Sequence, residues 1–216
     1  MLVGAAAGDA HIVLSGGSTP RAAYEAFVEA VRSVDIDISK ATLWFGDERC
    51  VPPDDDRSNY KMVEQSLLSP LADRPRPQVH RIKGELGPTA AADAYERELR
   101  EAGPPEFDLI LLGIGPDGHT ESLFPDQASL AERSRLVVGV EEAGLEPFVP
   151  RVSLTLPALA SGKQLVFLAA GESKAGAVAA AFGENAKPDP HIPSSLVAPL
   201  AKEVIVLLDP AAASQL

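Results

Sequence analysis

The sequence predicts a single α/β domain over residues 1–216, built on a doubly wound, mainly parallel sheet. Short runs rich in Val, Ile and Leu alternate with amphipathic stretches, as expected of strands buried on both faces and covered by helices. No internal repeat and no change of composition marks a linker. The length and the 45% content of hydrophobic residues suffice for a real core. Aromatic residues make up only 5%, so Ala, Val and Leu are expected to fill it.

The expected elements follow from the spacing of apolar residues. Six apolar runs predict strands, at residues 11–14, 42–45, 107–112, 136–140, 164–169 and 203–208. Three stretches repeat apolar residues at helical spacing, at residues 24–31, 92–102 and 175–182. Segments 52–57 and 187–193 are polar or rich in proline and predict loops.

Charge and cysteine content exclude several classes of protein. The chain has 19 Lys and Arg against 31 Asp and Glu, a net charge of −12, which disfavours nucleic acid as a partner. Its only cysteine, Cys50, excludes a disulfide scaffold and a cysteine-rich zinc site, and indicates a reducing compartment. No apolar stretch approaches the roughly 18 residues of a membrane span, and the first residues lack the basic start of a secretory signal. We therefore expect a cytoplasmic protein that does not engage membranes.

The segment 15–20 follows the first predicted strand and opens a helix. Thr19 suits the N-cap and Pro20 the first helical position. Gly16 and Gly17 let the backbone approach a ligand, and Ser18 adds a hydroxyl donor. Free N–H groups at the positive end of a helix favour an anion, so the loop predicts a phosphate site. The alternative is an ordinary strand-to-helix turn.

A second glycine loop, residues 113–118, formally matches the dinucleotide-binding pattern G-x-G-x-x-G, with Glu141 downstream in the place of a ribose-binding carboxylate. Pro116 and Pro125 argue against that interpretation, because they interrupt the loop and the helix that should follow. Asp117 and His119 lie two residues apart on this loop, where a carboxylate and an imidazole can point into one pocket. Histidine is the natural base near neutral pH, and a carboxylate can orient it. The alternative is a loop histidine bonded to backbone.

Three cations follow other predicted strands. Arg49 lies in the charged segment 46–49 and can clamp a phosphate, although a solvated charge cluster containing Asp47 is the alternative. Lys174 lies in the first turn of a predicted helix, where it opposes the dipole unless an anion binds there. Arg151 offers another guanidinium. The consecutive aspartates at 54–56 cannot converge on a metal, so no metal site is expected.

Together these loops resemble the 6-phosphogluconolactonase family. The matching segments are 15–20, 46–51 followed by Ser58-Asn59-Tyr60, 113–125, and Arg151 with 171–174; the string GIGPDGHTESLFP is the specific one. The resemblance implies the fold of glucosamine-6-phosphate deaminase. It also implies hydrolysis of 6-phospho-D-glucono-1,5-lactone to 6-phosphogluconate in the pentose phosphate pathway, without metal or organic cofactor.

The sequence departs from the family at three places. The chain mostly lacks the N-terminal strand and helix that family members have before the first glycine loop, so part of that region is expected to be missing. Glu121 stands where the family often has a small residue, and we expect it to point to solvent. The deaminases carry a glutamate at the position of Phe124, whose side chain cannot perform acid–base chemistry. Phe124 therefore favours the lactonase over the deaminase.

The resemblance and the residues together imply a division of roles. His119 is expected to act as general base, Asp117 to orient it, and Asp47 to border the sugar. The phosphate is expected to be held by Gly16, Gly17, Ser18, Thr19, Arg49, Arg151 and Lys174. The expected partner is a small sugar-phosphate lactone, and the expected state a monomer or weak homodimer. An NAD-dependent oxidoreductase and a non-catalytic sugar-phosphate sensor remain as alternatives.

Overall fold

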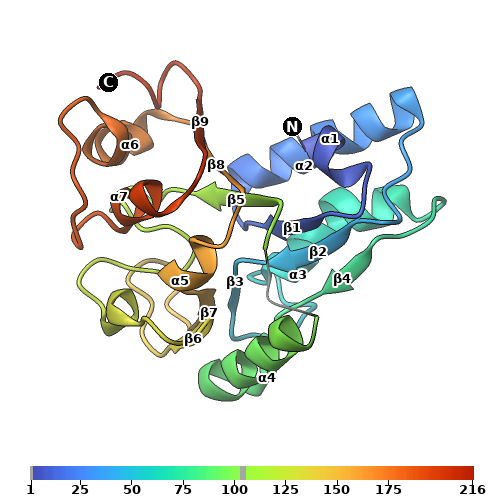
Figure 1. Cartoon of the computed structure of the whole chain (residues 1–216), viewed down its shortest axis with the longest axis horizontal. Coiled ribbons are helices and arrows are strands. Elements are labelled where there is room, and N and C mark those ends of the chain that lie inside the picture. The colour runs from blue at the N-terminus through green and yellow to red at the C-terminus, as the bar shows by residue number, and fades with distance from the viewer. Residues whose placement is uncertain (1, 103–105) are drawn as a thin grey trace.

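A six-stranded parallel sheet forms the centre of the computed structural model, which describes residues 2–102 and 106–216 (Figure 1). The strand order is β4-β2-β1-β5-β8-β9, and every neighbouring pair is parallel. The predicted α/β class with a mainly parallel sheet is therefore confirmed. The strands are β1 (His11–Leu14), β2 (Thr42–Phe45), β4 (Gln78–His80), β5 (Leu109–Gly113), β8 (Gln164–Ala169) and β9 (Val204–Leu208).

A small antiparallel sheet, in the order β3-β7-β6, was not expected. Its strands are β3 (Asp47–Arg49), β6 (Val137–Val140) and β7 (Arg151–Leu154). The prediction that segment 136–140 joins the parallel sheet is wrong, because β6 pairs with β7 instead. Strands β3 and β7 lie in segments where charged residues had indicated loops; hydrogen bonds rather than apolar periodicity accommodate their charged side chains.

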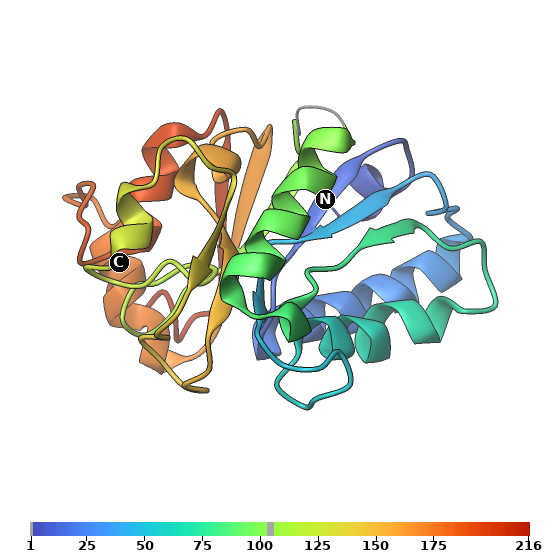
Figure 2. The ribbon, with the colours of Figure 1, turned by 90° about the horizontal axis from the view of Figure 1, so that it is seen from below.

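The helices cover both faces of the parallel sheet, and Figure 1 shows α2 and α4 on opposite sides of β1 and β2. All three predicted helical stretches are confirmed, in α2, α4 and α6. The helices are α1 (Leu2–Ala6), α2 (Ser18–Val34), α3 (Asn59–Val63), α4 (Pro88–Glu101), α5 (Leu156–Leu159), α6 (Ala175–Phe182) and α7 (Pro193–Val197). Seen from below, α4 lies between the blue N-terminal segments and the yellow-to-red segments that follow β5 (Figure 2). In the described part of the chain, no helix has both the length and the apolar character needed to cross a bilayer.

The start of α2 differs from the prediction by two residues. Gly17, not Thr19, is the N-cap, because a glycine tolerates the φ of 102° found there. Pro20 is then the third helical residue. Its missing N–H loses no hydrogen bond, since the first N–H groups of a helix have no partner within it.

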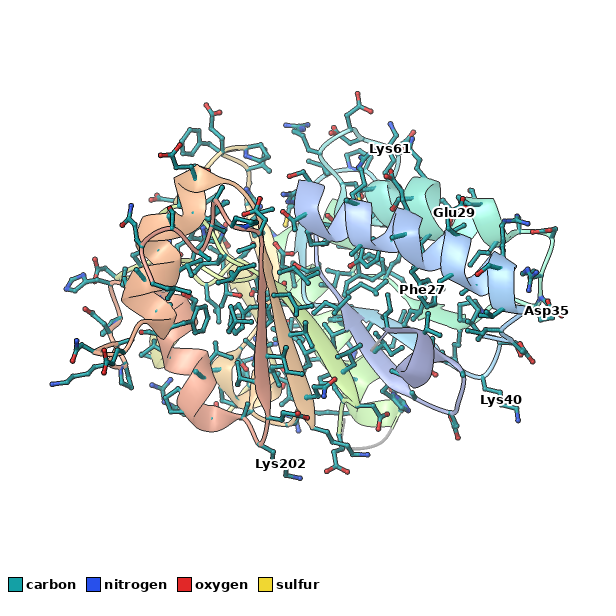
Figure 3. The ribbon with its side chains drawn as sticks, turned by 90° about the horizontal axis from the view of Figure 1, so that it is seen from above. Phe27, Glu29, Asp35, Lys40, Lys61 and Lys202 are labelled. Carbon is teal, nitrogen blue, oxygen red and sulfur yellow. The ribbon has the colours of Figure 1, made fainter. Side chains whose placement is uncertain are left out.

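The core is apolar on both faces of the sheet. Figure 3 shows Phe27 between α2 and the sheet, where it is buried. On the other face, Trp44 of β2 stacks on His80 with ring centroids 4.0 Å apart and meets the edge of Tyr95. His80 also contacts Glu98 through Nδ1, at 2.6 Å. His80 is therefore part of the packing.

Two buried tyrosines fasten the chain at the carboxyl ends of β1 and β2. The Tyr24 hydroxyl donates to the carbonyl of Ser15 at 2.8 Å and accepts from the N–H of Ser15 at 3.0 Å. The Tyr95 hydroxyl makes the equivalent pair of bonds with Phe45, at 3.0 and 2.8 Å. Burial raises the pKa of both phenols, so they stay protonated donors. These bonds fix the points from which the next loops depart.

The winding of the sheet reverses between β1 and β5. From β1 the chain adds β2 and β4 on one side, and from β5 it adds β8 and β9 on the other. In open α/β sheets, ligands bind outside the carboxyl ends of the strands at such a switch point. The loops that leave β1 and β5 are the two glycine loops singled out in the sequence.

Candidate active site

A pocket opens at this switch point, and residues following β1, β2, β5 and β8 line it. It brings together every predicted site residue except Asp117, which lies just behind the wall in contact with His119. The residues that it gathers are Gly16, Gly17, Ser18, Thr19, Asp47, Arg49, His119, Arg151 and Lys174. Residues distant in the sequence are therefore neighbours at one edge of the sheet.

The loop after β1 presents backbone donors to the pocket. The first hydrogen bond of α2 runs from the N–H of Arg21 to the carbonyl of Gly17, at 3.1 Å. The N–H groups of Ser18 and Thr19 precede it, and no side chain caps them. Free donors at the positive end of a 17-residue helix make this end of the pocket suitable for an anion.

Three cations face the same pocket without a carboxylate partner. Arg49 donates to the carbonyl of Arg57 at 2.7 Å, and Arg151 donates to the carbonyls of Pro147 and Val149 at 2.7 and 3.1 Å. Lys174 ends a short 3-10 turn directly before α6. Within the described residues, none of the three forms an ion pair.

Partial burial acts on two of these cations. Desolvation lowers the pKa of Arg151 and of Lys174, and for Lys174 the nearby charge of Asp117 opposes that effect. A bound anion would stabilise the charged forms of Arg151 and Lys174, which desolvation disfavours. The pocket is therefore locally positive in a chain whose net charge is −12.

His119, which lines the pocket, forms a pair with Asp117. The imidazole Nδ1 lies 2.6 Å from Oδ1 of Asp117, which also accepts the backbone N–H of His119 at 3.2 Å. Burial would raise the pKa of Asp117, but the hydrogen bonds and charge of His119 outweigh it and the pKa falls. An ionised Asp117 accepts, which assigns the proton to Nδ1 and leaves the lone pair on Nε2.

Asp47 is buried, at 6% exposure, and is held by residues whose role the sequence did not indicate. The amide of Asn59 donates to Oδ1 at 2.8 Å, and the hydroxyl of Ser122 donates to Oδ2 at 2.7 Å. Asn59 and Ser122 both lie in segments that resemble the family, 58–60 and 113–125, and that resemblance was the available signal for them.

Glu48 anchors the same region. Its carboxylate accepts the backbone N–H groups of Arg49, Asn59 and Tyr60 at 2.7–2.8 Å, and the Ser58 hydroxyl at 3.0 Å. Burial raises the pKa of Glu48, and these backbone bonds partly offset the effect. The alternative of a solvated charge cluster at 46–49 is therefore wrong for both Asp47 and Glu48.

Glu121 does not point to solvent, contrary to expectation. Its side chain is 7% exposed and lines the pocket. The reason is local: the φ of Glu121 is 51°, in the left-handed region, within the tight turn that pairs Thr120 with Leu123. That backbone turns the side chain inward.

The geometry disfavours a dinucleotide at the second glycine loop. Tight turns, not a helix, follow Gly118, and Glu141 is exposed outside the pocket. The structure therefore agrees with the argument from Pro116 and Pro125 that no helix follows this loop.

Comparison with known proteins gives consistent results. Residues 3–206 match the family described as glucosamine-6-phosphate isomerases/6-phosphogluconolactonase. The 6-phosphogluconolactonase of Streptomyces coelicolor is 38% identical, over 98% of this chain and 84% of its own length. The crystal structure of a protein described as devB aligns with a TM-score of 0.88 and 34% identity, covering 100% of this chain and 91% of that one.

A monomeric glucosamine-6-phosphate deaminase is similar in fold. It aligns with a TM-score of 0.81 at 24% identity, covering 96% of this chain and 88% of that one. The expected likeness to the deaminase fold is therefore confirmed. The pocket, the match over most of the sequence and these relatives agree: the chain belongs to the family of glucosamine-6-phosphate isomerases and 6-phosphogluconolactonases.

Proposed function

We propose that the protein hydrolyses 6-phospho-D-glucono-1,5-lactone to 6-phospho-D-gluconate, in the oxidative pentose phosphate pathway. One observation carries the proposal: His119, paired with Asp117, lines the same pocket as three cations that form no ion pair within the described residues. A base and an anion site in one cavity suit a phosphorylated substrate that water attacks. The similarity to 6-phosphogluconolactonases supports the choice of substrate.

The phosphate is proposed to bind at the start of α2. The N–H groups of Ser18 and Thr19, with Arg49, Arg151 and Lys174, supply donors and positive charge there. Binding the phosphate at one end holds the lactone carbonyl near His119 at the other. Such positioning replaces a bimolecular encounter by a reaction within one complex.

The hydrolysis is proposed to use His119 first as base and then as acid. Nε2 accepts a proton from water as the water oxygen bonds to C1, and backbone N–H groups of the loop stabilise the resulting oxyanion. When the bond between C1 and the ring oxygen breaks, His119 returns the proton to that oxygen. Asp117 holds the ring and stabilises the imidazolium, and Asp47 borders the sugar.

These steps need only side chains, backbone groups and water. Among residues 2–102 and 106–216, no group of three or more His, Cys, Asp or Glu side chains is arranged to hold a metal ion. The reducing environment expected for the half-buried Cys50 supports a cytoplasmic location, and we propose a monomer or weak homodimer.

Phe124 supports the lactonase over the deaminase. It is buried, its ring centroid lies 4.8 Å from that of His119, and the guanidinium of Arg151 lies 6.0 Å above it. An apolar ring at this point packs the base against a cation but cannot move a proton. The additional acid–base group that ring opening and amine transfer require is missing there.

Gly115 leaves room for the His119–Asp117 pair. A Cβ at Gly115 would overlap Nδ1 of His119 and Oδ1 of Asp117. Because both partners would have to move, the loop admits no larger residue without loss of the pair's geometry.

The proposed function is tested by following acid release from the lactone, corrected for spontaneous opening. Turnover above background is expected, whereas glucosamine 6-phosphate should yield no ammonia. Ammonia release at a rate comparable to lactone hydrolysis would reverse the choice between the two activities. Binding of 6-phosphogluconate without turnover would identify a sensor, and saturable NAD binding an oxidoreductase.

His119→Asn should lower kcat by about 10²–10⁴-fold, the usual scale for a lost general base. Asparagine keeps one polar group but cannot carry the proton, so binding of 6-phosphogluconate should persist. His191→Asn is the matched control, because His191 is exposed and pairs only with Asp126. A near-normal kcat in His119→Asn would move the base elsewhere, first to Asp47.

Lys174→Ala should raise KM by roughly 10–100-fold, the equivalent of one hydrogen bond to a charged group. Thermal stability should stay the same or rise, since the partly desolvated cation is removed. Lys202→Ala serves as control; Lys202 is exposed at the amino end of β9, where Figure 3 labels it. An unchanged KM with a lower Tm would make Lys174 a structural residue.

Gly115→Ala should reduce kcat by about 10²-fold, because a misplacement near 1 Å costs that much. Its crystal structure should show the His119–Asp117 contact broken. Gly8→Ala is the control, since a Cβ at Gly8 meets no atom within 4 Å. An intact pair with full activity would contradict the steric argument.

A further inference from the structure

Glu121 is a buried carboxyl group that the proposed mechanism does not use. Both of its oxygens are shielded from solvent, and neither accepts a hydrogen bond from any donor in the described residues. A buried carboxylate without donors is strongly disfavoured, because nothing replaces the water that it has lost. Glu121 must therefore be protonated, or a neighbouring group must stabilise its negative charge.

The donors around Glu121 serve other acceptors. The hydroxyls of Tyr24 and Tyr95 donate to backbone carbonyls of Ser15 and Phe45. The hydroxyl of Thr120 donates to the carbonyl of Gly113 at 2.8 Å. None of these groups has a second proton to offer, so none can stabilise an anion at Glu121.

The ionisable neighbour of Glu121 is Asp47, which has the opposite arrangement. Its two oxygens accept from Asn59 and Ser122, and it lies within the field of Arg151. The surroundings of Asp47 therefore stabilise a carboxylate, whereas those of Glu121 stabilise only a neutral carboxylic acid. Both residues line the same pocket, and the Glu121 carboxylate lies against Gly46, the residue before Asp47. Two neighbouring buried carboxyl groups commonly hold one proton between them.

We propose that Glu121 and Asp47 share one proton in the wall of the pocket, with Glu121 as the neutral partner that positions the Asp47 anion. Glu121 then donates the third hydrogen bond that Asp47 receives. Its covered oxygens do not reach substrate, so Glu121 is a positioning residue. This role rests on the proposed function, whereas the shared proton does not.

The chain leaves space for this carboxyl. A Cβ at Gly46 would overlap the carboxylate of Glu121, so the glycine between β2 and β3 admits it. The titratable groups that face it are Asp47 from β3, Tyr24 from α2 and Tyr95 from α4. Both phenols stay neutral, and Asp47 contributes the one negative charge.

The direction of titration follows from burial. Desolvation first, and then the charge and hydrogen bonding of Asp47, raise the pKa of Glu121 well above its ordinary value of 4.5. Between that value and the raised pKa, the unfolded chain has released a proton that the folded protein keeps. Stability therefore falls as pH rises through this window, and Glu121→Gln removes that slope.

The shared proton is tested without substrate. The infrared spectrum at neutral pH should contain the carbonyl stretch of a protonated carboxylic acid, which Glu121→Gln removes. Glu29→Gln is the matched control, since Glu29 lies on the exposed side of α2 (Figure 3). The unfolding constant of Glu121→Gln relative to wild type should fall by up to about tenfold per pH unit above 4.5. Identical spectra, or parallel stability curves, would overturn the proposal.

The positioning role is tested with 6-phosphogluconate and with the lactone assay. Glu121→Gln keeps a donor for Asp47, so kcat/KM at neutral pH should stay near wild type. Glu121→Ala should lose about tenfold or more, the effect of one hydrogen bond to a charged group. In wild type, product affinity should weaken at alkaline pH as a second anion forms beside Asp47, and in Glu121→Gln it should not.

The outcomes separate the two proposals. An acid band in a protein that hydrolyses no lactone would refute the function and leave the shared proton standing. If Glu121→Ala matches wild type in KM, kcat and pH profile, the positioning role is refuted while the function stands.

Discussion

The site depends on one topological constraint, the adjacency of β1 and β5 where the winding of the sheet reverses. Because β1 and β5 are parallel neighbours, their carboxyl ends lie at the same edge of the sheet, and the loops that follow them begin side by side. The glycine loop of β1 therefore meets the loop that carries His119, although about a hundred residues separate them. Tyr24 fixes the departure point of the first loop by bonding both backbone groups of Ser15. The pairing of β1 with β5 therefore sets the positions of both loops in the pocket.

Local features of the sequence were sufficient for the elements and for part of the site. The alternation of apolar runs predicted five of the six parallel strands, all except β4. The two-residue spacing of Asp117 and His119 predicted their contact, because it depends on neighbours in the chain. Strand β3 was not predicted because all three of its residues are charged, and β7 was not predicted because its four residues include Arg151 and Ser153 and form no apolar run. The burial of Asp47 and Glu48 is possible only with donors from segments 58–60 and 122, which no local pattern reveals. The inward turn of Glu121 depends on a left-handed φ that is rare for a residue with a side chain.

The distribution of charge divides the molecule into two electrostatic regimes. Surface carboxylates dominate the net charge and pair with most of the basic side chains near them. In the pocket, Arg49, Arg151 and Lys174 form no ion pair within the described residues, although the charges of Asp47 and Asp117 act on Arg151 and Lys174. An anion approaching the acidic surface is repelled in general and attracted at one opening, where a low-dielectric wall strengthens the attraction. This contrast supports the proposed binding of a small phosphorylated ligand in the pocket.

The overlap between Gly46 and the Glu121 side chain makes the two positions conditional on each other. A carboxylate at 121 is sterically admissible only while 46 carries no Cβ, whereas a glycine at 46 is compatible with any smaller residue at 121. With Glu121 in this conformation, any residue larger than glycine at 46 would force its carboxyl group to move. We therefore expect positions 46 and 121 to vary together among homologues, with glycine at 46 wherever 121 carries a long side chain in this conformation.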